Sequence, residues 1–237
     1  MMKKRVLISV LLVCAIAFMS SAQVEHHVVK LGEFTQLSLV DNINVNYRSN
    51  PDSAGLAVFS CTKEVANSII FSISAKGRLT IQVDDDYERL SNLPTITIYS
   101  TTLDEVDNSG DSTLRVSQLP PLKSFKVRLT DNGKVIVRDV RASKLELQIL
   151  SGKGKIITDG SCDELAVRLI GTGEIQADGV KATTVSCRIM GTGSIGCNVD
   201  GGPLKVSGSG TGKVYYKGNP SKVTVRKLGT IKAIPMQ

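Results

Sequence analysis

The most regular feature of the chain is an alternation of apolar and polar residues that recurs about every twenty residues from residue 109 to the end. In each clear copy, apolar side chains stand at every second position ahead of a glycine-rich turn. These runs are Phe125, Val127, Leu129; Leu145, Leu147, Ile149; Leu165, Val167, Leu169; and Val185, Cys187, Ile189. A period of two is typical of β-strands with one dry face and one wet face. The pattern therefore predicts short strands separated by tight turns.

The turns themselves form a series. Taking one residue in each turn as an anchor gives Ser112, Gly133, Gly154, Gly173, Gly193, Gly212 and Gly229, with spacings of 21, 21, 19, 20, 19 and 17. An aliphatic residue follows each anchor by two positions, at Leu114, Val135, Ile156, Ile175, Ile195, Val214 and Ile231. A unit of this size cannot bury its apolar side alone, but parallel stacking of equivalent strands buries a continuous interior.

We therefore predict an all-β protein in which residues 106–237 form a parallel β-helix of about 20 residues per coil. Right-handed crossovers are the strong default for parallel strands. Leucine-rich repeats are excluded because their L-x-x-L-x-L pattern is missing, and calcium-binding nonapeptide coils are excluded because Ile156, Ile175 and Ile195 stand where such coils need aspartate.

Residues 23–105 are also strand-like but do not keep the period. A hairpin is predicted over residues 70–83 with Lys76 and Gly77 at its turn. A short helix is predicted over Lys63–Ser68, where Thr62 would accept a hydrogen bond at its start. We expect this region to continue into the β-helix and to cap it, since an exposed layer of strand edges promotes aggregation.

The first 22 residues have the features of an export signal. Lys3, Lys4 and Arg5 precede an apolar run over residues 6–18, and small residues follow at 20–22. We expect the mature chain to begin at Gln23, without a transmembrane segment, and to be exported to the periplasm, the outer surface or the medium. Removing three cations lowers the net charge from +7 to +4. This excess is too small and too dispersed to indicate a nucleic-acid partner.

Four cysteines remain after Gln23, at positions 61, 162, 187 and 197, without CxxC spacing. Cys187 and Cys197 fall at apolar positions of the repeat, which favours small buried side chains. The alternative is a disulfide bond between these two cysteines after export.

Several of these features together resemble a known family. They are the export signal, the opening Phe34-Thr-Gln-Leu-Ser-Leu, the run Asp41-Asn-Ile-Asn-Val45 and the later Gly-Thr-Gly turns. Over residues 33–218 the chain is similar to the family called putative auto-transporter adhesin, head GIN domain, although Asn42 stands where that family usually has glycine. The resemblance implies an exported β-helical protein of a kind common in the Bacteroides group, and it supplies no catalytic residue.

The strongest candidate binding residues are Arg128, Arg168 and Arg188, each five positions before its anchor and therefore on the wet face of equivalent strands. Stacked coils would place Arg168 and Arg188 side by side, about 4.8 Å apart along the stack. Guanidinium groups in such a row suit forked hydrogen bonds to sulfate, uronate or phosphate. The competing interpretation is a solvated face balanced by Glu146 and Glu164.

A second candidate column contains Asp159, Asp178 and Asn198, each five positions after its anchor. Acidic clusters serve polysaccharide lyases and glycosidases, which makes a carbohydrate-active enzyme the rival hypothesis. However, Asp-Gly pairs at 159–160 and 178–179 are also ordinary turn signals.

The sequence indicates no catalytic residue, metal site or cofactor. Its two histidines, His26 and His27, stand near the start of the mature chain, where a mobile end is expected, so a Ser-His-Asp or Cys-His mechanism has no base in a shaped site. We therefore expect a non-enzymatic envelope or surface module that contacts an anionic glycan or another extended cell-surface polymer through one face of the β-helix.

Overall fold

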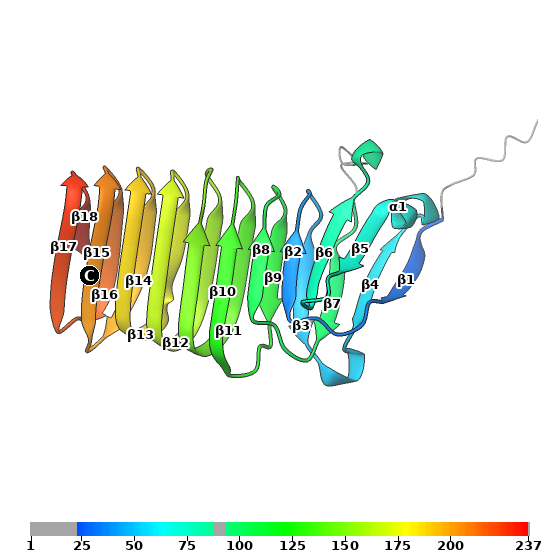
Figure 1. The fold of residues 1–237 in the computed structure, drawn as a ribbon, viewed down its shortest axis with the longest axis horizontal. Coiled ribbons are helices and arrows are strands. Elements are labelled where there is room, and N and C mark those ends of the chain that lie inside the picture. The colour runs from blue at the N-terminus through cyan, green and yellow to red at the C-terminus, as the bar shows by residue number, and fades with distance from the viewer. Residues whose placement is uncertain (1–22, 88–92, 237) are drawn as a thin grey trace, which may run out of the picture.

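The structure, a computed structural model, describes residues 23–87 and 93–236, so the predicted export signal lies outside the described residues. The fold is nearly all β, with 67% of the described residues in strands and 6% in helices. From β8 (Glu105–Asn108) onward, the chain winds into a parallel β-solenoid of about seven turns with about 20 residues in each (Figure 1). The predicted fold class is confirmed.

Two ladders of parallel strands enclose the interior. Ladder A contains, from the capped end outward, β6 (Arg78–Val83), β2 (Gln36–Leu39), β8, β10 (Leu122–Leu129), the second halves of β11 (Lys134–Ile149), β12 (Lys155–Gly171) and β13 (Glu174–Gly191), then β15 (Pro203–Gly210) and β17 (Lys222–Gly229).

Ladder B lies on the other side of the interior. In the same direction it contains β7 (Ile96–Ser100), β3 (Val45–Ser49), β9 (Thr113–Ser117), the first halves of β11, β12 and β13, then β14 (Ser194–Asp200), β16 (Lys213–Asn219) and β18 (Lys232–Pro235). The glycine-rich turns lead from ladder A to ladder B. At Gly191, φ is +135° and a Cβ would lie 2.2 Å from the carbonyl oxygen of Gly171, so a side chain would not fit between the stacked turns.

The predicted aliphatic column is the interior of ladder B. Its members are in register on successive strands, and each is fully buried: Leu114, Val135, Ile156, Ile175, Ile195 and Val214. The last copy was placed wrongly. Val214 pairs with Ala233 and Gly210 pairs with Gly229, so the residue equivalent to the anchor Gly212 is Ile231. The final coil is therefore shifted by two residues from the predicted alignment.

The order of the strands in space differs from their order in the sequence. β2 and β3 lie between the β6–β7 pair and the β8–β9 pair (Figure 1). Their connecting turn packs on the turn that follows β8: Asn42 accepts a hydrogen bond from the Asp111 backbone nitrogen at 3.1 Å, and Asn44 accepts one from Thr113 at 2.8 Å. Ile43 is fully buried between them.

An antiparallel region caps this end of the stack. β1 (Glu25–Lys30) pairs with β4 (Leu56–Cys61), and β5 (Ile69–Ile73) forms with β6 the hairpin that the sequence predicts. Helix α1 (Lys63–Ser68) also matches its prediction, with Thr62 accepting from the Val65 nitrogen. Two 3-10 helices, η1 (Pro51–Ser53) and η2 (Asp85–Tyr87), lie in the connections.

Candidate functional site

The outer face of ladder A carries side chains in columns, because equivalent residues of successive turns are in register. The arginine column runs through Asp107, Arg128, Gln148, Arg168, Arg188, Ser207 and Arg226. The neighbouring mixed column, two residues earlier on each strand, runs through Glu105, Lys126, Glu146, Ala166, Ser186, Lys205 and Thr224.

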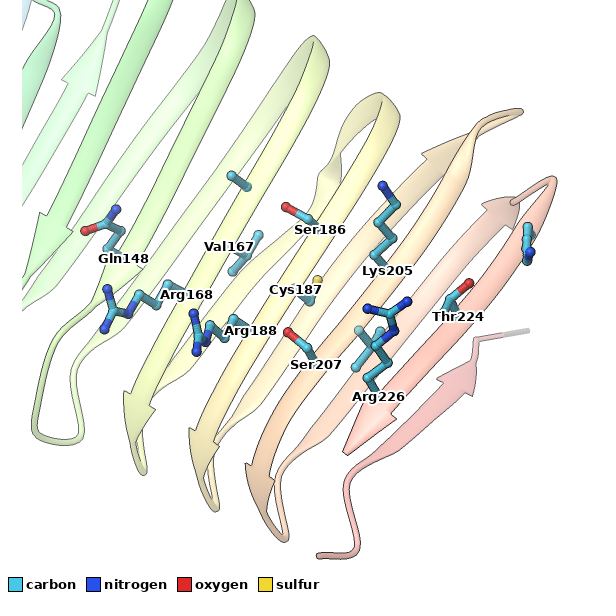
Figure 2. A pocket seen from close by; sticks show the side chains of 13 residues that line it. Gln148, Val167, Arg168, Ser186, Cys187, Arg188, Lys205, Ser207, Thr224 and Arg226 are labelled. Atoms are coloured by element: carbon cyan, nitrogen blue, oxygen red, sulfur yellow. The ribbon is translucent and has the colours of Figure 1, made fainter. Parts of the chain in front are cut away.

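The C-terminal parts of these two columns, together with Lys222 two residues before Thr224 on β17, line a depression of about 620 Å³ on ladder A, which we call the basic hollow. Its long side chains are Arg168, Arg188, Lys205, Lys222 and Arg226, and the short ones between them are Ala166, Ser186, Ser207 and Thr224. Figure 2 shows Arg168 and Arg188 side by side on neighbouring strands, with Ser186 and Ser207 nearby. The face is hollowed because short side chains stand between long cationic ones.

The charge of the basic hollow is not neutralised from within. All five of its cationic residues are exposed, and none of them forms an ion pair within the part of the chain that the structure describes. The residues that line it include no Asp, Glu or His. Cations gathered on one face raise the local positive potential and attract anionic groups.

Arg128 has a different environment. Gln148 separates it from Arg168 in the arginine column, and its guanidinium group pairs with Glu105 on β8 and lies 3.8 Å from Asp107. Glu105 also accepts a hydrogen bond from Arg78 at 2.7 Å. The structure thus brings two of the three predicted arginines together and places the third in a largely neutral cluster outside the hollow.

The cluster perturbs the acidity of its carboxyl groups. Burial by itself raises the pKa of Glu105, but the hydrogen bonds and charges of Arg78 and Arg128 outweigh burial and leave the pKa below its usual value. Burial raises the pKa of Asp107, and the positive charge of Arg128 offsets this only in part. Glu105 is therefore the carboxylate that holds the two arginines together.

We expect Glu105→Gln to destabilise the fold by about 1–2 kcal/mol at pH 7, because two guanidinium groups lose their shared anion. Since its folded-state pKa is lowered, Glu105 stabilises the fold above its unfolded pKa, and this contribution is lost as the pH falls through the folded pKa. The difference in the free energy of unfolding between the variant and the wild type should therefore become smaller as the pH falls. Urea titrations between pH 7 and pH 3 measure it, with the exposed Glu25→Gln as control. A constant difference would contradict this role.

The predicted acidic column is not a column in the structure. Asp159 is in register with Gly179, and Asn198 with Lys181 and Lys217, because the register shifts at the bends of β12 and β13. Each acid has its own partner: Asp159 pairs with Arg138 and accepts from the Asp139 backbone nitrogen, while Asp178 lies 3.6 Å from the Lys217 amine. Their contacts fix the bends and do not converge.

The described cysteine and histidine side chains are buried or hydrogen-bonded. The four described cysteines are buried and free, and burial raises the pKa of Cys162 to about 12. A hydrogen bond with Cys197, together with burial, raises the pKa of Cys187 well above its usual value. His26 and His27 lie on β1 and contact Ser60 and Cys61, so the mobile end expected for them was wrong. No group of three or more metal-binding side chains occurs among the described residues.

Sequence reasoning missed Lys205, Lys222 and Arg226. Arg226 had a usable signal: it stands five positions before Ile231, as Arg168 and Arg188 stand before their anchors. Placing the last anchor at Gly229 concealed this equivalence. Lys205 and Lys222 gave no such signal, because their positions hold different residue types in the other turns.

Comparisons with known proteins agree on the fold. Residues 33–220 match the sequence pattern of the family described as putative auto-transporter adhesin, head GIN domain. A putative adhesin from Bacteroides fragilis is similar in structure, with a TM-score of 0.81 and 21% identity over 91% of this chain and 98% of that one. A putative adhesin from Parabacteroides merdae has a TM-score of 0.70 and 19% identity over 92% and 98% of the two chains.

A protein from Parabacteroides distasonis described as a putative lipid binding protein has a TM-score of 0.67 and 20% identity over 92% of this chain and 98% of that one. No curated protein matches the sequence. At these identities the solved structures show a shared fold. Among the described helices, none has the length and apolar character needed to cross a membrane.

Proposed function

Because the chain belongs to the family described as putative auto-transporter adhesin, head GIN domain, we propose that it is an exported, non-catalytic module of the cell envelope or surface that binds an extended anionic polymer. The polymer class favoured is a sulfated, uronate-containing or phosphate-containing glycan. The proposed binding residues are Arg168 and Arg188, joined by Arg226, Lys205 and Lys222.

The observation that carries this proposal is the basic hollow, whose five cations form no ion pair with any described residue. These cations stand on four successive strands of ladder A, with Lys222 and Arg226 both on β17, so the strands present positive charges at intervals of about 4.8 Å along the solenoid axis. A row of this kind can contact several anionic groups of one chain at once. Arginine offers each group a planar fork of donors, and the hydroxyls of Ser186, Ser207 and Thr224 can bind the oxygens between them.

The composition of the hollow favours binding over catalysis. Glycoside hydrolysis commonly uses two carboxyl groups on opposite sides of the scissile bond. The hollow has no carboxyl group among its lining residues, and the acids of the rival column are individually paired elsewhere. A positively charged surface without carboxyl or imidazole groups can retain a polyanion without cleaving it.

The proposal is tested with the chain from Gln23 onward on immobilised heparin, alginate and uncharged dextran, using biolayer interferometry. We expect binding to the anionic polymers alone, with an affinity that falls as salt rises. Arg168→Ala/Arg188→Ala should weaken it at least tenfold, since each hydrogen bond to a charged group contributes about 1.5–3 kcal/mol.

The matched control is Arg48→Ala/Arg115→Ala, which removes two exposed arginines from the outer face of ladder B. Equal weakening by both double variants would show that net charge alone determines binding, and the assignment to the hollow would then be wrong. Retention on anionic lipid vesicles but on no polysaccharide would replace the polymer by a lipid head group. Release of sugar fragments from any polymer would favour the enzyme hypothesis instead.

A further inference from the structure

The two ends of the solenoid differ. One is covered by β1, β4, β5 and α1, whereas the other finishes with β17 and β18 without any further described element on top (Figure 1). In the described part of the chain, β17 pairs only with β15, and β18 only with β16. Their outer edges therefore present unpaired backbone donors and acceptors, which can pair with another strand.

The last turn also exposes apolar surface that earlier turns bury. Val223 and Val225 are each 39% exposed, whereas the residues paired with them, Leu204 and Val206, are 0% and 2% exposed. Leu228 is 77% exposed. A terminal repeat normally needs a polar covering to stay soluble, and here the aliphatic interior reaches the end of the stack.

The charge of this end is entirely positive. Residues 201–237 contain seven cations and no Asp or Glu: Lys205, Lys213, Lys217, Lys222, Arg226, Lys227 and Lys232. Only Lys217 forms an ion pair, with Asp178, among the residues that the structure describes. Two such ends facing each other would repel, so an acidic surface is the complementary partner.

The capped end has that acidic character. Leaving out β2, β3 and the start of β8, which lie farther along the stack, residues 23–35 and 50–100 contain eight Asp and Glu against five Lys and Arg. Glu64 on α1 and Asp84, Asp85 and Asp86 at η2 are exposed, and the Tyr87 hydroxyl donates to Glu64 at 3.1 Å, which places these acids in one cluster.

The capped end also has unpaired strand edges and exposed apolar residues. In the described chain β1 pairs only with β4, and β5 only with β6. Val28 on β1 is 56% exposed, and Ile70 and Ile73 on β5 are 40% and 37% exposed. The two ends thus match in apolar character and oppose each other in charge.

We propose that the basic open end of one copy docks on the acidic capped end of a second copy, so that molecules associate head to tail. Like ends repel, which disfavours dimers that join two open ends or two capped ends. A contact between two different surfaces does not close on itself in a straight stack, so it propagates into rows. Rows would align the basic hollows of successive copies along one axis, and this association does not depend on what the hollow binds.

The test is sedimentation velocity of the chain from Gln23 onward at about 0.01 M and about 1 M salt, where the Debye length is about 30 Å and about 3 Å. We expect concentration-dependent association at low salt that is lost at high salt. A tail variant, Lys227→Glu/Lys232→Glu, and a cap variant, Asp85→Lys/Asp86→Lys, should each be monomeric alone. Neither variant changes a residue of the hollow.

An equimolar mixture of the two variants should associate again, because the tail variant keeps its acidic capped end and the cap variant keeps its basic open end. This rescue also shows that both variants are folded. The control Lys123→Glu/Lys153→Glu changes the net charge as much as the tail variant, at exposed positions in the middle of the solenoid, and should associate like the wild type. Monomeric wild type at low salt, association of either variant alone, or a mixture that stays monomeric would each overturn the proposal.

Discussion

Gly208→Ala is expected to destabilise the C-terminal turns by about 3 kcal/mol or more. At Gly208 φ is +148°, and a Cβ would lie 1.7 Å from the carbonyl oxygen of Ile189 on the preceding turn. This oxygen belongs to the backbone of a paired strand, so it cannot move aside without breaking ladder A. The substitution should separate β15 from β13.

The matched control for this prediction is Gly201→Ala. Gly201 also has a positive φ, +81°, but no atom outside its immediate chain neighbours lies within 4 Å of the position that a Cβ would take. Gly201→Ala should therefore destabilise the fold only by the cost of a left-handed backbone conformation at alanine, about 1–2 kcal/mol. Thermal and urea midpoints of both variants, with hydrogen exchange over residues 185–236, measure the difference. Equal destabilisation would mean that backbone conformation, not the close stacking of turns, requires glycine at 208.

The interior columns were predictable because the period of two shows which side chains face inward. Ile156, Ile175 and Ile195 follow directly from it, and so does the adjacency of Arg168 and Arg188 on the wet face. Local signals also sufficed for α1, where Thr62 caps the helix, and for the hairpin around Gly77. These features depend on nearby residues or on a repeat that keeps its length.

The position of β2 and β3 was not predictable by the same reasoning. Periodicity identifies a face but not which strand lies beside another. Ile43 is equivalent to Ser112 in the stack, yet the two are 69 residues apart in the sequence, because the residues that form the cap lie between them. The misplaced last anchor has a related cause: Gly229 continues the series of glycines along the sequence, whereas hydrogen bonding pairs it with Gly210 and puts Ile231 at the anchor.

The basic hollow depends on the same register. Neither Arg226 nor Lys222 can be assigned to it without the correct stacking of the last turn. Its isolation from acids is also a property of the fold: Glu164 is close in sequence to Arg168 and Glu146 lies one turn earlier, but neither lines the hollow. A charge balance counted along the sequence therefore underestimates how positive this face is.

Ile175→Asp is expected to divide the solenoid into two parts of unequal stability. Ile175 is fully buried and lies between Ile156 and Ile195 in the interior of ladder B. An unpaired carboxylate there should cost at least about 4 kcal/mol, whereas Ile175→Val should cost about 1 kcal/mol. Because each turn contacts only its neighbours, the loss falls on two adjacent contacts between turns and not on the whole stack.

The two parts differ in what covers their ends. Turns on the N-terminal side of Ile175 remain attached to the cap, while those beyond it have an open end with exposed Val223 and Val225. We therefore expect β14 to β18 to lose hydrogen-exchange protection first. Limited proteolysis of Ile175→Asp should leave a resistant fragment that retains the cap and β8 to β11. Uniform loss of protection from β1 to β18 would show instead that the solenoid unfolds as one cooperative unit, since the damage would then have spread beyond the turns that touch residue 175.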